Sequence, residues 1–568
     1  RNSSKNYRGN KPKKYCRLED VMKSKKSFKI LAGGIAFIAI ISVAFTSSDL
    51  YRKIAKSQRL INEAYKYLLT NYVDQLDTDV YTSATLRNLL SELDPYTVYL
   101  EENERDGIEL LSKGQYGGVG IQLSRRSDQL TVIAPFDDSP AKRSGIISGD
   151  IITKIDDNIA IELSLDDAAK LIRGIKGSVV VLTIERYGSD HPLEFALTRE
   201  DIHVKNVSYS GMLNESTGYI RLTRFSKNAP TEIQQALRSL EKEDVSEIIL
   251  DLRDNPGGLL AAAIDIMDIF IPKGELLLTT RGRTKASNKT YHARRPISVS
   301  RNIKIAILIN EGSASASEIV AGAFQDLDRG IIIGQSSFGK GLVQSVFSLD
   351  PTRSLKITTA KYYIPSGRLI QKSDYVDEDI VIQIAEEDSI FSTKGGRAVK
   401  GGGGIHPDHE VDSEELPPLT QECLRKGIFF SYAQKHKHLY RSFDQVVNDE
   451  SLLIKFHTFI EEQEVDVALP GENQFRDAWK KLEDYTEGNS KLHFAFTKAE
   501  EVIIESENAL FNNELNELER GLFLEFAGLF GGTESRIRES LKNDVVVQKA
   551  MSILSNQVAY NGTFSIPN

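Results

Sequence analysis

The sequence predicts a multidomain protein of the α/β and α+β classes, in which a central α/β core is flanked by a strand-rich module and by helical regions. Between about residues 201 and 409, apolar strands alternate with amphipathic helical stretches. Short strands and turns occupy residues 114–200, and helical periodicity dominates residues 50–113 and 410–568. At 568 residues the chain is too long for one compact core, so several domains are expected.

Charge is distributed unevenly along the chain. The formal net charge is −9, but residues 1–48 carry eleven lysines and arginines and only two acidic residues, so the remainder is strongly acidic. An acidic body repels phosphate backbones, and nucleic acid is therefore not an expected partner. The two cysteines, Cys16 and Cys423, are too few for a disulfide framework or a thiolate metal site.

Residues 22–48 are predicted to be an export segment. Four lysines precede an uncharged, mainly apolar run over residues 30–45, and small polar residues follow it, as in a signal peptide or signal anchor. The run is short for a membrane span, and Ser42-Val43-Ala44 suits a cleavage site, so anchor and cleaved signal both stay open. The basic flank predicts that the chain after about residue 48 is exported. Because Met22 resembles a natural start, residues 1–21 are expected to be an upstream extension.

Both ends of the exported body are predicted to be helical. In the N-terminal region an apolar stripe is expected to pack in a core or a homodimer, and Asp94-Pro95 ends a second helix near Leu93. The stripe comprises Ala55, Leu60, Ile61, Ala64, Tyr65 and Leu68. In the C-terminal region a long helix over about residues 498–530 is expected to start at Thr497 and to stop at Gly531-Gly532. No chemistry is predicted there.

The strand-rich module and the α/β core follow different patterns. One helix, 165–173, interrupts the strands of the module, and Ser164 is its expected N-cap. The strands expected in the module are 119–123, 130–134, 151–155 and 179–186. In the core the expected strands are 218–222, 247–252 and 303–309, and the expected helices are 230–240, 259–270 and 317–326. In such a layered α/β structure, sites lie beyond the carboxyl ends of strands.

A serine-rich segment marks the junction that follows the last of these strands. Asn310-Glu-Gly-Ser-Ala-Ser-Ala-Ser-Glu-Ile319 leaves a strand and opens a helix, whose free N–H groups are suited to hold the oxygen anion of a tetrahedral intermediate. Taken alone, the segment also fits a serine-rich helix cap. A Gly-Gly turn at residues 257–258, after another strand, offers a second backbone N–H, although such turns are often only structural.

A second segment, Phe338-Gly-Lys-Gly-Leu-Val-Gln344, places a lysine between two glycines. These glycines let the backbone bring Lys340 close to a reacting centre. A lysine acts as a general base only when uncharged, so burial or cationic neighbours must lower its pKa. No phosphate-binding Gly-x-x-x-x-Gly-Lys-[Ser/Thr] pattern is present.

Together these segments resemble the carboxyl-terminal processing peptidases, also called tail-specific proteases, over residues 94–408. The most specific motifs are Ser-Ala-Ser-Ala-Ser-Glu-Ile at 313–319 and Phe-Gly-Lys-Gly-Leu-Val-Gln at 338–344, and residues 358–371 are also family-like. The resemblance implies a crotonase/ClpP-like α/β core with an inserted PDZ domain. Ser337 departs from the threonine that is frequent in the family, but it keeps the hydroxyl.

The resemblance also implies residue roles. Ser315 is the expected nucleophile, Lys340 its general base, and Gln344 the residue that orients the lysine. The oxyanion hole is expected from the backbone N–H groups of Ala316 and of the turn 257–258, with Gly257 as the first choice over Gly258.

A PDZ-type peptide site is predicted at residues 118–121. Gly118-Val-Gly-Ile121 resembles the carboxylate-binding loop of PDZ domains, and successive N–H groups of Val119, Gly120 and Ile121 would hold the C-terminal carboxylate of a peptide that adds as a β-strand. By resemblance, Arg173 couples the position of this domain to the active site. An exposed arginine at a helix end is also common without such a role.

The sequence therefore predicts a serine endopeptidase that binds protein tails and needs no metal, nucleotide or other cofactor. The expected location is the bacterial cell envelope, on the periplasmic side of the inner membrane or free in the periplasm, with membrane contact through the N-terminal segment. Two alternatives are a PDZ scaffold with a degenerate protease core and a crotonase-like acyl-CoA enzyme. The intact Ser315, Lys340 and Gln344 disfavour the first, and export disfavours the second, because CoA is cytosolic.

Overall fold

The computed structural model describes residues 51–101, 114–126, 129–372, 390–412, 415–465, 467–469, 471–486 and 490–565. The chain divides into two compact units, Arg1–Asn88 and Leu89–Asn568. Among the described residues, no helix is both long enough and apolar enough to cross a membrane. The predicted extension 1–21 and export segment 22–48 lie outside the described residues and stay predictions.

The first unit contains a helix over residues 51–71 and most of α2 (Thr78–Ser91). Tyr65 joins the two helices, because its ring lies 5.8 Å from that of Tyr81 and its hydroxyl bonds with Thr82 Oγ1 at 2.5 Å. The predicted apolar stripe is not buried in a core here, since Leu60 is 73% exposed and Ile61 is 55% exposed. Its role in a homodimer stays a prediction.

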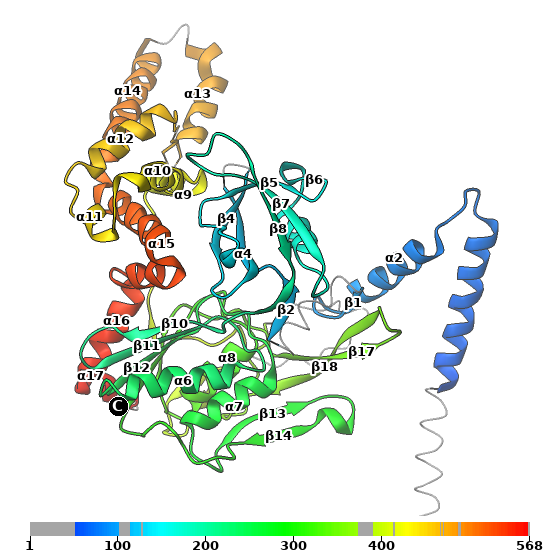
Figure 1. Cartoon of the computed structure of the whole chain (residues 1–568). Coiled ribbons are helices and arrows are strands. Elements are labelled where there is room, and N and C mark those ends of the chain that lie inside the picture. The colour runs from blue at the N-terminus through cyan, green and yellow to red at the C-terminus, as the bar shows by residue number, and fades with distance from the viewer. Residues whose placement is uncertain are drawn as a thin grey trace, which may run out of the picture. The chain divides into compact units, whose positions relative to one another are not determined.

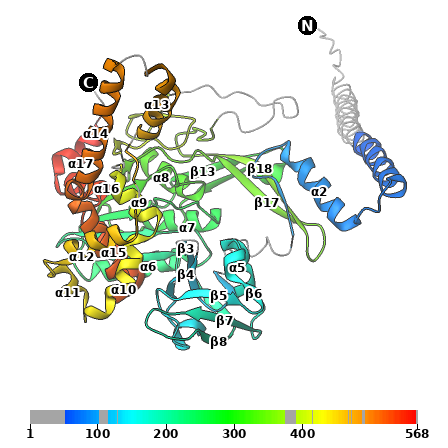
Figure 2. The ribbon, with the colours of Figure 1, turned by 90° about the horizontal axis from the view of Figure 1, so that it is seen from above.

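The strand-rich module folds around its own apolar core. All the strands in its main sheet pair antiparallel, in the order β3-β4-β5-β7-β8, so β3 forms one edge and lies beside α5 (Figure 2). The chain enters and leaves the module through β2 and β9, which pair antiparallel. The elements are β2 (Gln115–Gly118), β3 (Ile121–Arg126), β4 (Gln129–Pro135), α4 (Pro140–Arg143), β5 (Ile151–Ile155), β6 (Asn158–Ile159), α5 (Leu165–Ile172), β7 (Val179–Glu185), β8 (Leu193–Thr198) and β9 (Glu200–His203).

The expected helix of the module is confirmed. α5 begins after Ser164, whose hydroxyl accepts a hydrogen bond from the Asp167 N–H at 3.1 Å. Alternate apolar residues of the strands, including Val180, Leu182 and Ile184, are fully buried, as expected for a sheet with one face on a core.

The α/β core contains a six-stranded sheet in the order β10-β11-β12-β15-β16-β21, in which only β10 is antiparallel to its neighbour. Figure 1 labels β10, β11 and β12 of this sheet. The strands of the sheet are β10 (Val207–Met212), β11 (Thr217–Leu222), β12 (Glu247–Asp251), β15 (Lys304–Ile309), β16 (Ile331–Gly334) and β21 (His409–Glu410). The helices α6 (Ala229–Glu241), α7 (Leu260–Phe270) and α8 (Ala316–Asp326) pack with this sheet in one apolar cluster. Because β12 and β15 are adjacent and parallel, the loops that follow them start at the same edge.

A second sheet stands beside this core. It joins β1, β18, β13 and β14, and β17 pairs antiparallel with β18. The strands are β1 (Val98–Leu100), β13 (Leu276–Arg281), β14 (Lys289–His292), β17 (Leu342–Ser348) and β18 (Ser354–Tyr363). A small hairpin, β19 (Ile390–Ser392) with β20 (Ala398–Lys400), follows in the chain.

The C-terminal region is helical, as predicted, but its long helix differs from the prediction. Thr497 lies inside α14 and its hydroxyl donates to the His493 carbonyl, so it is not a cap. Helix α14 ends before Glu514, whose carboxylate accepts hydrogen bonds from Leu419 and Thr420, and α15 continues through Gly532 with a kink there. The helices are α9 (Pro418–Arg425), α10 (Ile428–His436), α11 (Phe443–Val447), α12 (Leu452–Glu462), α13 (Glu472–Thr486), α14 (Ser490–Asn513), α15 (Leu515–Leu541), α16 (Val545–Ser555) and α17 (Gln557–Thr563).

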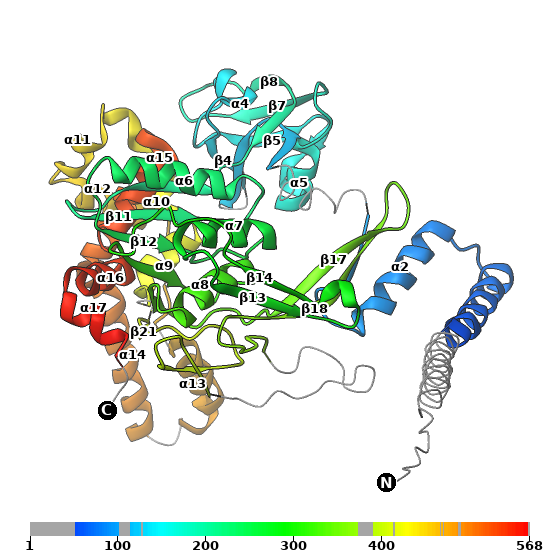
Figure 3. The same cartoon turned by 90° about the horizontal axis from the view of Figure 1, so that it is seen from below.

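The last two helices pack on the α/β core. Val546, Val547 and Ala550 of α16 share an apolar cluster with residues of β12, β15 and β16, including Ile249 and Leu308. Figure 3 shows α16 and α17, in red, beside this sheet. The helices α16 and α17 therefore cover one face of the core sheet, and α6, α7 and α8 cover the other.

Candidate active site

Ser315 lies at a strained junction between a strand and a helix. β15 ends at Ile309 and α8 begins at Ala316. Ser315 has φ 56° and ψ −109°, a conformation that costs a non-glycine residue about 1–3 kcal/mol. Gly257 lies against it, because a β-carbon on Gly257 would come 3.0 Å from Ser315 Cβ and 2.8 Å from the Ala316 nitrogen. Strain of this kind concentrates at functional sites, and here it falls on the predicted nucleophile.

The structure distinguishes the three serines of the motif. Ser313 and Ser317 are fully buried, and their hydroxyls each donate at 2.8 Å, to the carbonyls of Leu252 and Asn255 respectively. Ser315 is only partly buried. Of the three hydroxyls, that of Ser315 is therefore the one that a substrate can reach.

Glu318, which was not among the predicted site residues, ties Ser315 to the lysine segment. One of its carboxylate oxygens accepts hydrogen bonds from the backbone N–H groups of Ser315 at 2.7 Å and Lys340 at 2.9 Å. The other oxygen accepts from the Gly339 N–H at 2.7 Å and the Ser337 hydroxyl at 2.6 Å. Burial raises the pKa of Glu318, and these four hydrogen bonds oppose that shift. The spacing Ser315-x-x-Glu318 matches a capping box, and this pattern could have pointed to Glu318 from the sequence.

Tyr362 of β18 makes a second connection between the two segments. Its hydroxyl lies 2.5 Å from the Lys340 carbonyl oxygen and 3.1 Å from that of Ser315. Burial raises the pKa of Tyr362 well above its ordinary value, so the hydroxyl stays protonated and available as a donor. Glu318 and Tyr362 thus fix the backbones of the predicted nucleophile and base relative to each other.

The surroundings of the Lys340 side chain lower its pKa on balance. Lys340 Nζ lies 4.2 Å from the centre of the Tyr96 ring. Burial lowers the pKa of Lys340, the nearby charge of Lys356 lowers it further, and Glu318 and Asp94 act in the opposite direction. A depressed pKa is the property required of a lysine general base.

Two predicted side-chain contacts are not formed in this conformation. Although both residues are described, no hydrogen bond joins Ser315 Oγ to Lys340 Nζ. Gln344 donates to Thr358 Oγ1 at 3.4 Å instead of contacting Lys340, and Thr358 in turn donates to Asp94 at 3.2 Å. The fold brings the three residues into one region, but their roles in the reaction stay predictions.

The predicted oxyanion groups surround Ser315, with one difference from the expectation. The Gly257 N–H, the first choice, donates to Asn255 Oδ1 at 2.9 Å and is occupied in this conformation. The N–H groups of Gly258 and Ala316 contact no acceptor among the described residues. Gly258 has φ 147°, and a β-carbon there would lie 2.4 Å from the Phe225 carbonyl oxygen. The structure therefore leaves Gly258 and Ala316 as the available donors.

A groove of about 420 Å³ lies between β3 and α5. Val119, Gly120 and Ile121 line one side, and Ala169 and Ile172 line the other. Gly118 is not in its lining, since it lies in β2 and pairs with Glu200. Gly120 has φ 74°, and a β-carbon there would lie 2.3 Å from Ser139 Cβ, so glycine is required. Because β3 is an edge strand, its outer side is open to another strand.

Arg173 and Tyr116 also line this groove. The Arg173 guanidinium carbon is 5.2 Å from the centre of the Tyr116 ring. Burial raises the pKa of Tyr116, while the charges of Arg173 and Arg224 lower it. Arg224 precedes Phe225, whose N–H donates to the Gly257 carbonyl at 3.0 Å. Tyr116 and Arg224 were absent from the predicted site: Tyr116 lines the groove, and Arg224 adjoins the residue that bonds to the turn beside Ser315.

His406 and His409, at the end of the core, form hydrogen bonds with other parts of the fold. His406 bonds with Ser336 at 3.0 Å and His409 with Thr563 at 2.8 Å. Asp408 pairs with Arg397 at 2.7 Å and accepts from the Ile332 N–H at 2.8 Å. These contacts attach the end of the core to its neighbours.

Comparison with known proteins identifies the family of this chain and of its domains. The profile of peptidase family S41 matches residues 216–382, that of the PDZ domain matches 132–186, and that of a C-terminal helical domain of probable PDZ-proteases matches 419–554. The carboxy-terminal-processing protease of Bartonella bacilliformis is 36% identical over 337 residues, which cover 59% of this chain and 76% of that protein. The carboxyl-terminal-processing protease of Synechocystis is 34% identical over 374 residues, 63% of this chain and 87% of that protein.

Among solved structures, the photosystem II D1 C-terminal processing protease is 26% identical with a TM-score of 0.35, and the match covers 63% of this chain and 88% of that one. The predicted fold class is confirmed, with an S41 core, a PDZ domain and a helical C-terminal region. The chain therefore belongs to peptidase family S41 and is a serine-type endopeptidase of the carboxy-terminal-processing group.

Proposed function

We propose that Ser315 is the nucleophile, that Lys340 is its general base, and that the PDZ domain selects protein substrates by their C-terminal tails. The observation that supports the dyad most directly is the Glu318 carboxylate oxygen shared by the backbones of Ser315 and Lys340. The lowered pKa of Lys340, caused first by burial, agrees with this role. Contacts between a nucleophile and its base are often loose without substrate, so the open Ser315–Lys340 contact is compatible with it.

In the proposed reaction, uncharged Lys340 accepts the hydroxyl proton as Ser315 Oγ bonds to the scissile carbonyl carbon. The resulting oxygen anion accepts hydrogen bonds from Gly258 and Ala316, and from Gly257 if the Asn255 contact opens. Lys340 then gives its proton to the departing amine as the C–N bond breaks. Water hydrolyses the ester and releases the carboxylic acid product. Gln344 is proposed to orient Lys340 once substrate closes the site.

The groove between β3 and α5 supports tail recognition. An extended peptide would continue the sheet along the open edge of β3. Its terminal carboxylate would accept hydrogen bonds from the loop of Val119, Gly120 and Ile121. We further propose that Arg173 conveys occupation of this groove to the Gly257-Gly258 turn by way of Tyr116 and Arg224.

The dyad predicts a single modification site for an acylating β-lactone, which forms an ester with a serine nucleophile. The ester is expected on Ser315, in parallel with loss of proteolysis, while the buried Ser313 and Ser317 stay unmodified. Mass spectrometry of the peptide that contains residues 313–317 measures this. Inactivation that maps to another residue would contradict the proposal. A chain that neither reacts nor cleaves tail peptides would favour a non-catalytic scaffold, and binding of CoA would favour an acyl-CoA enzyme.

Blocking the groove should weaken tail binding. Ala169 lies in the groove wall, so Ala169→Trp is expected to raise the Kd of a tail peptide about tenfold or more and to leave the β-lactone reaction at Ser315 intact. Fluorescence anisotropy with a labelled peptide measures the Kd. Lys170→Ala, a change of an exposed side chain on the same helix, is the matched control. Equal affinities of both variants would exclude this groove as the tail site.

A further inference from the structure

The loop over residues 251–258, here called the oxyanion loop, lies directly against the serine motif. The Asn255 carbonyl accepts hydrogen bonds from the Ala314 N–H at 3.0 Å and the Ser317 hydroxyl at 2.8 Å, one on each side of Ser315. Asp254 and Asn310 exchange two further hydrogen bonds, each of 2.9 Å. The position of this loop therefore sets the surroundings of both Ser315 and the Gly257-Gly258 turn.

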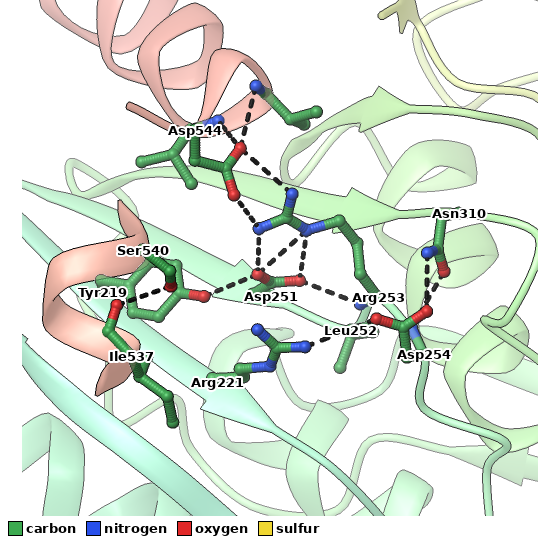
Figure 4. Close-up of polar contacts among 12 residues, drawn as sticks. Tyr219, Arg221, Asp251, Leu252, Arg253, Asp254, Asn310, Ile537, Ser540 and Asp544 are labelled. Carbon is green, nitrogen blue, oxygen red and sulfur yellow. Dashed lines mark hydrogen bonds and ion pairs between the residues drawn. The ribbon is translucent and has the colours of Figure 1, made fainter. Parts of the chain in front are cut away.

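Arg253, at the start of this loop, is held between two carboxylates (Figure 4). On one side its guanidinium bonds to Asp251 at 2.6–3.1 Å, and Asp251 is fully buried and also accepts from Tyr219 at 2.6 Å. On the other side the two terminal nitrogens of Arg253 bond to the two carboxylate oxygens of Asp544, at 3.1 and 2.8 Å. This paired geometry fixes the guanidinium in plane and direction, which a single contact would not do.

Asp544 belongs to the C-terminal helices, almost three hundred residues further along the chain. One of its carboxylate oxygens caps α16 by accepting from the Val546 and Val547 N–H groups, each at 3.0 Å. Val546 and Val547 are buried against the core sheet. The carboxylate is therefore fixed to the sheet by its own helix, and only 18% of the side chain is exposed. Such an anchor is rigid enough to position a loop.

We propose that Asp544 is a positioning residue for catalysis, which acts through Arg253 to hold the oxyanion loop in place beside Ser315. The proposal rests on the proposed role of Ser315 and extends it. It assigns the C-terminal helices a role in catalysis, although none of their residues was predicted to contribute to the chemistry. The Asp544 carboxylate does not itself contact the reacting groups.

The test compares substitutions of two N-cap residues, Asp544 of α16 and Asn556 of α17. Asp544→Asn keeps an oxygen that can cap α16, but it removes the charge and places an amide against the Arg253 guanidinium. The expected result is a fall in kcat of about ten- to a hundredfold with little change in KM, because the loop shifts while tail binding is untouched. Asn556→Ser is the matched control, since Asn556 caps α17 in the same way and makes no contact with the oxyanion loop.

A double-mutant cycle separates positioning from a general loss of stability. If Asp544 acts through Arg253, Arg253→Gln combined with Asp544→Asn should lose no more kcat than Arg253→Gln alone. Thermal unfolding of each variant checks that the chain is folded. Losses that multiply, a wild-type kcat for a folded Asp544→Asn variant, or an effect confined to KM would overturn the proposal.

The same samples also report on the underlying function. If β-lactone inactivates the wild-type chain without modifying Ser315, the proposed nucleophile is wrong, and the positioning role falls with it. If Ser315 is modified in the wild-type chain and reacts at an equal rate in Asp544→Asn, only the positioning role is overturned. The supporting outcome is a slower reaction of Ser315 in that variant and an unchanged rate in Asn556→Ser.

Discussion

Replacing Lys340 with alanine should lower kcat by about 10²- to 10⁴-fold, because the Ser315 hydroxyl loses the group that accepts its proton. Lys340 is only partly buried and its backbone N–H still bonds to Glu318, so the variant should fold. Initial rates on a quenched-fluorescence peptide, with circular dichroism of the same sample, measure both effects. Lys372→Ala is the matched control. Lys372 is exposed, and its backbone N–H donates to the Gly339 carbonyl, next to Lys340 in the chain. Normal turnover by Lys340→Ala would refute the proposed base.

The pH dependence of the rate is a second test of Lys340 as the general base. Activity should rise with pH as Lys340 loses its proton, and the rise should lie below the range of an ordinary lysine, because burial and Lys356 lower the pKa. Lys356→Gln removes one of these two influences and raises the pKa of Lys340, so the rise in kcat/KM should move to higher pH. A profile that stays in place or moves to lower pH would show that another group controls the rate.

Replacing Glu318 with glutamine should lower kcat at least about 10²-fold and reduce the midpoint of thermal unfolding. The carboxylate accepts four hydrogen bonds in a fully buried site, whereas an amide offers one oxygen and turns an N–H₂ group towards two donors. Each hydrogen bond lost from a charged acceptor costs about 1.5–3 kcal/mol. The backbones of Ser315 and Lys340 then lose their common attachment, and small displacements of reacting groups have large effects on rate.

Glu311→Gln provides the comparison for this change, because Glu311 is exposed and lies in the segment that leads to Ser315. Its kcat and unfolding midpoint should match those of the wild-type chain. Rapid-quench measurement of ester formation at Ser315 separates a slow acylation in Glu318→Gln from a slow hydrolysis. Acylation at the wild-type rate in Glu318→Gln would contradict the positioning role of this carboxylate.

The local features of the site were predictable because they depend on residues that are close together in the chain. The helix after Ser315, the glycines that surround Lys340, and the α5 N-cap at Ser164 follow from spacing and from backbone preference. The roles of Ser315, Lys340 and Gln344 came from resemblance to a known family. That resemblance placed Ser315 and Lys340 in one region, which the fold confirms, but it gave Gln344 a contact with Lys340 that is absent from this conformation.

The class of fold and the strand-to-helix junction that carries Ser315 followed from the residues alone, and the PDZ-like pattern at residues 118–121 followed from resemblance. The surroundings of these segments depend on the folded chain: Tyr96 and Lys356 lie near Lys340, the Tyr362 hydroxyl donates to two carbonyls, and Arg253 bonds to Asp544. The reason is that hydrogen-bond spacing and side-chain periodicity act over a few residues. Burial, by contrast, sums over segments that are distant in the chain, and it is the largest cause of the lowered pKa of Lys340. The hydrogen bonds that hold the oxyanion loop against the serine motif likewise join residues that are far apart in the sequence.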